Sequence, residues 1–240
     1  MASTEDLGLE GRVLAIAGAG GSLGPTVVRR LAPTGARLAL AGRDAEPLEA
    51  LASDVGIDAD VTSVDLLDAA ATRAWADGIA ERMGRVDGLL HLVGGWRGGK
   101  PIEESPREDW DFLASLLIDT LQNVTHAFIP HLLESGRGRF AIVSAAQAQA
   151  PTNTNAAYAA AKAAAEAWTL AFAHRLVGTG ATANIVVVGS IVSPEMRAES
   201  PDKDFSTFTP AESIADALAY LCSDAAAPMN GQRLTLRGSA

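Results

Sequence analysis

Residues 13–24 read Val-Leu-Ala-Ile-Ala-Gly-Ala-Gly-Gly-Ser-Leu-Gly, and this stretch decides the fold of the chain. Five apolar residues in a row, without alternating polar ones, are typical of a strand buried on both faces of a sheet. The glycines that follow let the backbone turn sharply and approach a pyrophosphate, and a helix after them would offer free N–H groups and the positive end of its dipole. Between a strand and a helix, this loop favours a dinucleotide site over a plain turn. Its predicted contact residues are Gly18, Gly21, Ser22, Leu23 and Gly24.

The same alternation of short apolar runs and longer amphipathic segments continues along the chain. The predicted strands are 12–17, 37–41, 59–64, 88–93, 139–144, 182–188 and 233–236, and the predicted helices lie near 24–33, 45–54, 69–83, 107–134, 155–177 and 211–222. Repeated strand–helix–strand units with right-handed crossovers build a doubly wound parallel sheet. We therefore predict an α/β fold: a single doubly wound (Rossmann) domain over residues 1–240, with a seven-stranded, mainly parallel sheet and helices on both faces.

The composition fits one domain in the cytoplasm. The 240 residues are 48% hydrophobic and 20% charged, which indicates neither disorder nor a membrane protein. The net charge of −10 is spread along the chain and argues against a nucleic-acid partner, which would need a basic face. The acidic N-terminus lacks the features of a signal peptide, and no apolar run approaches the length needed to cross a bilayer. With one cysteine, Cys222, and four scattered histidines that we interpret as structural or solvated, no metal site is expected.

The end of the second predicted strand, Ala41-Gly42-Arg43-Asp44, indicates which nucleotide would bind. At this point of a dinucleotide-binding fold, an acidic residue suits the 2′-hydroxyl of NAD and an arginine suits a 2′-phosphate. Position 42 has no carboxylate, whereas the Arg43 guanidinium matches phosphate geometry with two parallel hydrogen bonds. Asp44 could approach the ribose, but we expect it to cap the helix that begins at Ala45. The sequence therefore favours NADP(H), with NAD(H) as the alternative.

Tyr158 and Lys162 are the strongest candidates for catalysis. The chain has only two tyrosines and three lysines, and this pair lies four residues apart in an alanine-rich helical run. Residues at i and i+4 share one face of a helix, and a cation beside a phenol lowers the phenol pKa towards neutrality. A tyrosine tuned in this way can donate or accept a proton at physiological pH. The alternative is an ordinary helix whose tyrosine packs and whose lysine is solvated.

Taken together, these motifs closely resemble the short-chain dehydrogenase/reductase family, and the resemblance covers essentially the whole chain. The glycine motif, the Asp65-Leu66 pair, the Tyr158 and Lys162 pair and Asn230-Gly231-Gln232 follow the order and spacing of the family. The resemblance implies that Tyr158 is the general acid/base and that Lys162 binds the nicotinamide ribose and lowers the tyrosine pKa. It also implies that Asp65 and Leu66 contact the adenine and that Gly189 and Ser193 lie in the loop that flanks the nicotinamide. Gly94 is a further predicted cofactor contact.

Two of the four catalytic positions of the family are replaced in this chain. The family's catalytic serine lies thirteen residues before the tyrosine, where this chain has Ala145. Ser144 comes one place early, and because a one-residue slip turns a strand side chain to the opposite face, it could supply the hydroxyl only through a local bulge. The helical asparagine of the family's proton relay corresponds to Leu117. The family's Asn-Asn-Ala-Gly segment reads His91-Leu92-Val93-Gly94, so that only its glycine is retained.

Side chains near these positions are candidates to line a substrate pocket and to replace the missing donors. We assign to this pocket Ser144, Ala145, Gln147, Trp96 and Asn153. The segment from Pro194 to Pro210 would form a loop over the substrate, and it carries no readable signal of specificity.

Loss of one hydrogen-bond donor to a developing oxyanion typically lowers turnover by about a hundred- to a thousandfold. Because this chain lacks the family's serine and asparagine, two classes of function remain open. The first is an NADP(H)-dependent oxidoreductase that interconverts a carbonyl and an alcohol on a small-molecule substrate. The alternative is a non-redox protein on the same fold, either a nucleotide-binding regulatory subunit or a cyclase, isomerase or lyase that uses the pocket. Retention of Tyr158 and Lys162 favours the first class.

The resemblance also implies assembly, because the family usually forms dimers and tetramers through the helices that correspond to 107–134 and 155–177. Small residues on the second helix permit close approach of a neighbouring helix, and Trp168 and Phe172 would supply apolar area. We therefore expect a homodimer or a homotetramer.

Overall fold

The apolar run that follows Arg12 forms the centre of a parallel sheet in the computed structural model, which describes residues 7–238. The strands of this sheet are β1 (Val13–Ala17), β2 (Arg37–Gly42), β3 (Asp60–Ser63), β4 (Gly88–His91), β5 (Arg139–Ala145), β6 (Thr182–Val188) and β9 (Arg233–Thr235). They lie in the order β3-β2-β1-β4-β5-β6-β9, and every pairing is parallel. All residues of β1 and β6 are buried, as expected for strands covered on both faces.

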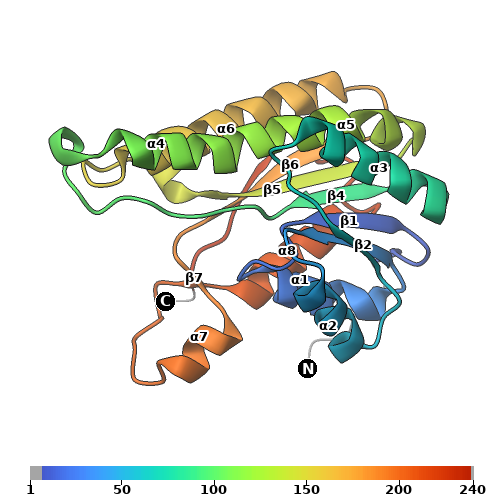
Figure 1. Cartoon of the computed structure of the whole chain (residues 1–240), viewed down its shortest axis with the longest axis horizontal. Coiled ribbons are helices and arrows are strands. Elements are labelled where there is room, and N and C mark those ends of the chain that lie inside the picture. The colour runs from blue at the N-terminus through green and yellow to red at the C-terminus, as the bar shows by residue number, and fades with distance from the viewer. Residues whose placement is uncertain (1–6, 239–240) are drawn as a thin grey trace.

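Helices cover both faces of the sheet (Figure 1). They are α1 (Gly24–Leu31), α2 (Glu46–Val55), α3 (Ala69–Met83), α4 (Arg107–Ala114), α5 (Thr120–Glu134), α6 (Ala156–Arg175), α7 (Pro194–Glu199) and α8 (Ala211–Leu221). One core forms where α3, α5 and α6 pack on the sheet, with Trp75, Phe128 and Phe140 among its members. The other forms on the opposite face beneath α1, α2 and α8. The predicted fold class, a seven-stranded doubly wound sheet, is confirmed.

The helix predicted over residues 107–134 contains an irregular turn. Between α4 and α5, residues Ser115–Asp119 form a π-helical turn, so that the backbone runs on without a break but with one wider turn. π-Helical turns inside α-helices often mark functional sites. The apolar pattern did not predict this turn, because a single wider turn changes the spacing of the buried residues only slightly.

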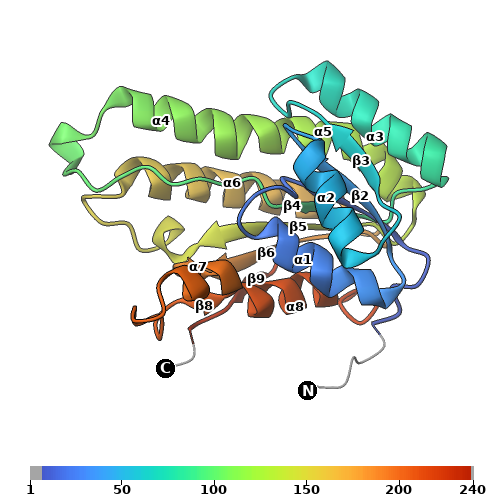
Figure 2. The same cartoon turned by 60° about the horizontal axis from the view of Figure 1, so that its bottom comes forward.

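The segment 194–210 is not a plain loop. Ser193 accepts a hydrogen bond from the backbone N–H of Met196 at 3.2 Å and so caps α7, and Pro194 occupies the first helical turn. A small second sheet joins β7 (Ile191–Val192) to β8 (Thr209–Pro210) and closes the segment at its base. Figure 2 shows α7 and α4 towards the same end of the molecule, on opposite layers.

Two expectations about apolar surfaces need correction. The helical stretch Arg107–Glu134 has 28 residues and a window of mean hydropathy 1.2, so among the described residues one helix does meet the length and composition of a membrane span. That helix packs against α3 and β4, as a core helix does. Phe172 is buried against Phe140, with ring centroids 5.2 Å apart, so it belongs to the core and leaves no area for a subunit contact.

Candidate functional site

The carboxyl ends of the parallel strands bring the predicted site residues to one edge of the sheet. The first loop beyond this edge is held to its neighbours by backbone hydrogen bonds: the N–H groups of Gly18 and Ala19 both donate to the Ala41 carbonyl at 3.0 Å. On the other side, the N–H of Leu92 donates to the Ala17 carbonyl at 2.8 Å. Ligands of open parallel sheets bind in the crevice outside such strand ends.

The glycine loop between β1 and α1 is shaped by contacts that exclude side chains. Gly18 has a φ of +81°, and a Cβ there would lie 3.0 Å from the backbone nitrogen of Val93. A Cβ at Gly24 would collide with the carbonyl of Ala19. Gly21 and Ser22 are exposed, and within the described residues no side chain caps the first turn of α1. Free N–H groups at the start of a helix fit an anionic pyrophosphate, so this loop is suited to a dinucleotide.

Arg43 stands exposed beyond the carboxyl end of β2. Its carbonyl accepts a hydrogen bond from the Ser63 hydroxyl at 2.6 Å, which fixes its main chain to the end of β3. Within residues 7–238 its guanidinium pairs with no carboxylate, so it is available for an anion. Asp44 does not cap the next helix, contrary to expectation: α2 begins at Glu46, and its N-cap, Ala45, already has helical dihedral angles and no side-chain hydrogen bond.

Asp65 and Leu66 follow β3 on the same side of the crevice. Asp65 is exposed and its carboxylate accepts a hydrogen bond from the N–H of Leu67 at 3.0 Å. The Leu66 side chain is buried in the core, so any contact with a nucleotide would come from its main chain. Asn123, on α5, donates to the carbonyls of Leu66 and Leu67 at 2.9 and 3.2 Å and so fixes this turn.

Tyr158 and Lys162 lie on the face of α6 that is turned towards β5. Tyr158 is half-buried and packs against a small apolar cluster that includes Leu113 and Leu117. Lys162 is only 8% exposed, and its Nζ donates a hydrogen bond to the carbonyl of Val143 at 2.9 Å. The same Nζ lies 5.9 Å from the centre of the Tyr158 ring. The structure therefore places the predicted pair together, with the lysine beneath the tyrosine.

The protonation equilibria of this pair are governed mainly by burial. Burial lowers the pKa of Lys162 from 10.5 to about 8, against the opposing influence of the Glu166 carboxylate. Burial also raises the pKa of the Tyr158 phenol above its usual value of 10. The expected lowering of the tyrosine pKa by Lys162 is thus not found, because desolvation of the buried phenol raises this pKa instead.

The end of β5 shows that Ser144 does not replace the missing hydroxyl. β5 pairs with β6 in unbroken register up to Ala145 and Val188, so the bulge that would re-aim Ser144 is not formed. The Ser144 hydroxyl is buried and donates to the Glu166 carboxylate at 2.6 Å. Ala145, also buried, is one residue further along the strand and faces the opposite way. The predicted assignment of Ser144 to the substrate pocket is therefore wrong.

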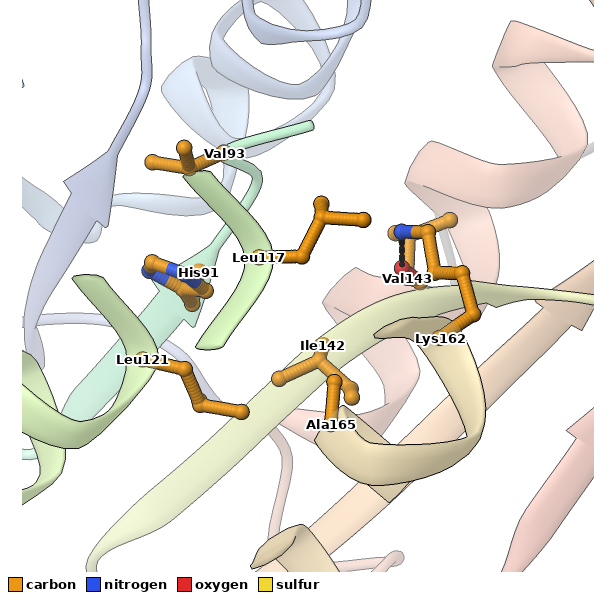
Figure 3. A pocket seen from close by; sticks show the side chains of 8 residues that line it. All are labelled: His91, Val93, Leu117, Leu121, Ile142, Val143, Lys162 and Ala165. Carbon is orange, nitrogen blue, oxygen red and sulfur yellow. Dashed lines mark hydrogen bonds between the residues drawn. The ribbon is translucent and has the colours of Figure 1, made fainter. Parts of the chain in front are cut away.

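Leu117 lies in the π-helical turn and faces a small cavity beside Lys162 (Figure 3). The cavity has a volume of about 10 Å³, and its wall includes His91 at the end of β4 and Ile142 on β5. Leu117 adds only an apolar surface to this wall. The position at which the family resemblance calls for an asparagine therefore lies beside Lys162, and its side chain has no polar group.

The rim of the crevice is formed by loops that follow β4, β5 and β6. Gly94 and Gly189 are both exposed there. Trp96 is 59% exposed, and beyond it the N–H of Gly99 donates to the carbonyl of Thr154 at 2.7 Å, which joins this loop to the start of α6. Other candidates in the same region are Asn153, which is exposed, and Gln147, which is half-buried.

Comparison with known proteins decides the family. The sequence matches the short chain dehydrogenase family over residues 12–204. This protein belongs to the short-chain dehydrogenase/reductase family. D-threitol dehydrogenase of Mycolicibacterium smegmatis is 30% identical over 97% of this chain and 94% of its own. Gluconate 5-dehydrogenase of Gluconobacter oxydans is 29% identical over 96% and 94%. A crystal structure of gluconate 5-dehydrogenase from Burkholderia cenocepacia, in complex with NADP and tartrate, is 28% identical, with a TM-score of 0.86 over 97% of this chain and 96% of that one.

As a short-chain dehydrogenase/reductase with relatives named as dehydrogenases and reductases, the chain is an oxidoreductase. Within this frame, two residues stand out that sequence reasoning did not assign to the site. Glu166 is buried below Lys162, where its carboxylate accepts from Ser144 and pairs with the Arg233 guanidinium at 2.6 Å. Its spacing of four residues from Lys162 was the available signal. His91, which we predicted to be structural or solvated, is buried in the wall of the cavity next to Lys162.

Proposed function

We propose that this short-chain dehydrogenase/reductase is an NADP(H)-dependent enzyme that interconverts a carbonyl and an alcohol on a small-molecule substrate. The observation that carries the proposal is the placement of Tyr158 over the buried Lys162 at the same sheet edge as the glycine loop. A half-buried phenol above a buried ammonium group suits proton transfer, and a scaffold without chemistry has no use for such a pair.

The nucleotide would lie across the carboxyl ends of β1, β2 and β3. Gly18, Gly21, Ser22, Leu23 and Gly24 would hold its pyrophosphate, with the N-terminal turn of α1 facing the charge. Arg43 would bind the 2′-phosphate, because its guanidinium is exposed and unpaired within the described residues. The B. cenocepacia relative, whose structure contains NADP, supports this choice. Asp65 and the main chain of Leu66 would line the adenine, and Gly94, Gly189, Ser193 and Lys162 the nicotinamide ribose end.

Tyr158 would act as the proton donor when a carbonyl is reduced. When bound, the nicotinamide supplies the hydride that adds to the carbonyl carbon. The carbonyl oxygen then takes the phenolic proton, so that an alcohol and a tyrosinate result. Because burial raises the tyrosine pKa, the phenol stays protonated at neutral pH and ready to donate. Oxidation of an alcohol needs the phenol to lose its proton first, and the same burial opposes that step.

The replacement of the family serine by Ala145 leaves the substrate oxygen with one protein donor fewer. Tyr158 then supplies the only side-chain hydroxyl that we assign to this oxygen. Turnover of simple ketones should be slow, by about a hundred- to a thousandfold relative to a site with the serine. Substrates that carry their own hydroxyl next to the carbonyl would suffer less, because that hydroxyl can donate in its place. Threitol and gluconate, in the names of the two relatives, have hydroxyls on adjacent carbons, so oxidation at one of these carbons would leave a hydroxyl next to the new carbonyl.

A substrate panel tests the proposal. Purified protein is titrated with NADPH and with NADH, and consumption of the bound cofactor is then followed over simple ketones, hydroxyketones and keto acids. The reverse reaction is followed with NADP⁺ and polyols or sugar acids. We expect tighter binding of NADPH and turnover of at least one hydroxylated carbonyl. Preference for NADH would contradict the cofactor assignment, and binding of NADPH without turnover of any compound would favour the non-redox alternative.

We further propose that the protein is a cytoplasmic homodimer or homotetramer without a nucleic-acid or membrane partner. Trp96, Ile102 and Phe112 expose apolar area near the start of α4, and Trp168 is half-buried on α6. These helices are the surfaces through which the resemblance implies assembly. Sedimentation at micromolar concentration should show a dimer or a tetramer, and a monomer would refute this part of the proposal.

A further inference from the structure

His91 carries a buried nitrogen that the proposed reaction does not use. The residue is 4% exposed at the carboxyl end of β4, and its side chain lines the cavity next to Lys162 (Figure 3). Its Nε2 lies 3.4 Å from the Thr120 hydroxyl, whereas its Nδ1 has no hydrogen-bond partner among the described residues. Burial of a polar atom without a partner is unfavourable and rare in folded proteins, so a partner is expected.

The hydrogen-bond chain fixes which nitrogen of His91 carries the proton. The Thr120 hydroxyl has one hydrogen, and it donates this hydrogen to the carbonyl of Leu116 at 2.7 Å. Towards His91 the hydroxyl can therefore only accept, so Nε2 must be the donor. Burial and the charge of Lys162 lower the pKa of His91 to about 3, so the ring is neutral at physiological pH. In this neutral ring, Nδ1 is an acceptor with a free lone pair.

Lys162 supplies the complementary donors on the other side of the cavity. Its ammonium group has three hydrogens, of which one is used at the carbonyl of Val143. The cavity volume of about 10 Å³ is close to the space that one water needs. We propose that one water occupies this cavity, accepts a hydrogen bond from Lys162 Nζ and donates one to His91 Nδ1, so that His91 positions and stabilises the Lys162 ammonium group.

The chain of hydrogen bonds ends at His91. A proton passed along it from Lys162 would have to convert a buried neutral ring into an imidazolium, which the low pKa of His91 disfavours. His91 is therefore a positioning residue that keeps Lys162 charged, rather than a group that carries protons away. The effect on catalysis rests on the proposed function, in which a charged Lys162 holds the ribose and supports Tyr158. The coupling between His91 and Lys162 does not depend on it.

The charged and titratable groups around Lys162 are few among the described residues. Tyr158 and Glu166 share its helix, His91 faces it from β4, and Arg233 on β9 neutralises Glu166 from behind. Because Glu166 is tied to Arg233 and Ser144, its influence should stay constant when His91 is changed.

Nuclear magnetic resonance of nitrogen-15-labelled side chains tests the inference without substrate or cofactor. The wild-type histidine spectrum should show His91, assigned by its loss in His91→Phe, with Nε2 protonated and Nδ1 bare down to about pH 5. The chain has three lysines, so the Lys162 signal can be assigned with Lys162→Arg and titrated. His91→Phe retains an aromatic ring but removes the acceptor nitrogen Nδ1. The midpoint of the Lys162 titration should therefore fall by about one pH unit.

Two matched variants sharpen the result. His91→Asn retains an acceptor oxygen and should leave the Lys162 midpoint near that of the wild type. His131→Phe changes a histidine that pairs with Asp77 on α3, and it should have no effect. A wild-type His91 protonated on Nδ1, or an unchanged Lys162 midpoint in His91→Phe, would overturn the inference; His91→Asn lacks the same histidine signal and gives the assignment if His91→Phe does not fold. A lowered midpoint together with failure of every redox assay would support the coupling and refute the proposed function.

Discussion

The nucleotide half and the catalytic half of the same sheet edge differ in what they demand of the sequence. In the nucleotide half, the loop between β1 and α1 works through its backbone, and glycines stand where a Cβ would collide with Ala19 or press on Val93. In the catalytic half, between β4, β5 and α6, the family positions for a serine and an asparagine carry Ala145 and Leu117. The nucleotide half thus depends on the shape of its backbone, and the catalytic half depends on single side chains.

Replacement of Lys162 should produce the largest effect, because this residue serves both halves. In Lys162→Ala, turnover should fall by about a thousandfold or more, and NADPH should also bind more weakly, since the ammonium group supports Tyr158 and holds the ribose. Arg175→Ala, in an exposed cationic residue at the far end of the same helix, is the control. Steady-state kinetics and a binding titration measure the two losses separately. If the variant loses turnover but retains full NADPH affinity, Lys162 acts in catalysis and does not contribute to binding of the nucleotide.

Removal of the Arg43 side chain should affect the nucleotide half alone. Arg43→Ala should weaken NADPH binding by about 2–4 kcal/mol, as for a charge-assisted pair, and leave NADH binding nearly unchanged. Arg175→Ala, in an exposed arginine at the end of α6, serves as the control. Fluorescence or calorimetric titration with both cofactors gives the difference. Equal weakening for NADPH and NADH would show that Arg43 does not read the 2′-phosphate.

Restoration of the serine should make the catalytic half more like that of other family members. Ala145→Ser should raise turnover of simple ketones by up to about a hundredfold, because one donor to the developing oxyanion is regained. Leu117 still contributes no polar group, so complete recovery is not expected. Ala146→Ser, on the exposed neighbouring residue, is the matched control. Equal rates in the wild type and in Ala145→Ser would mean that this position does not face the substrate oxygen.

Burial of His91 in the catalytic half should make the free energy of unfolding depend on pH. Its folded pKa of about 3 lies below its usual 6.5, so the stabilising neutral state is complete above pH 6.5 and is lost as the pH falls towards 3. Between pH 6.5 and 5, the free energy of unfolding should therefore fall by about 2 kcal/mol through this group. His91→Phe should flatten that part of the curve in denaturant titrations. A variant curve parallel to the wild type would show that His91 titrates normally.

The fold was predictable because buried strands and glycine turns leave direct traces in a sequence. The predicted strand over 182–188 has the observed bounds, and the helix over 69–83 does too. The π-helical turn and the short helix α7 were not predicted. The turn differs from an α-helix by one extra residue, and the sequence sign of α7 is the capping residue Ser193. Alternation along β5 correctly predicted that Ser144 and Ala145 face opposite ways. The hydrogen bond between Ser144 and Glu166 could not be predicted, because it depends on how α6 packs on β5.

The site was predictable as a set of positions and less so as a set of protonation states. Tyr158 and Lys162 could be found from their spacing, and the structure brings them together. The sequence could not show that burial would raise the tyrosine pKa, because desolvation depends on residues that are distant in the chain. The sequence placed His91 in the fourth predicted strand, but it could not show that this histidine would lie beside a buried lysine, because that depends on how α6 packs.

Binding and hydride transfer measured on the same samples test the account most directly. Wild type and Tyr158→Phe are loaded with NADPH, mixed with a hydroxylated carbonyl that the wild type reduces, and followed in a single turnover. We predict nearly equal NADPH affinity, with transfer slowed by about a thousandfold or more in Tyr158→Phe, because only the transferable proton is removed. Equal rates in both proteins would contradict the central claim, as would NADPH binding by the wild type and Ala145→Ser without consumption of any carbonyl.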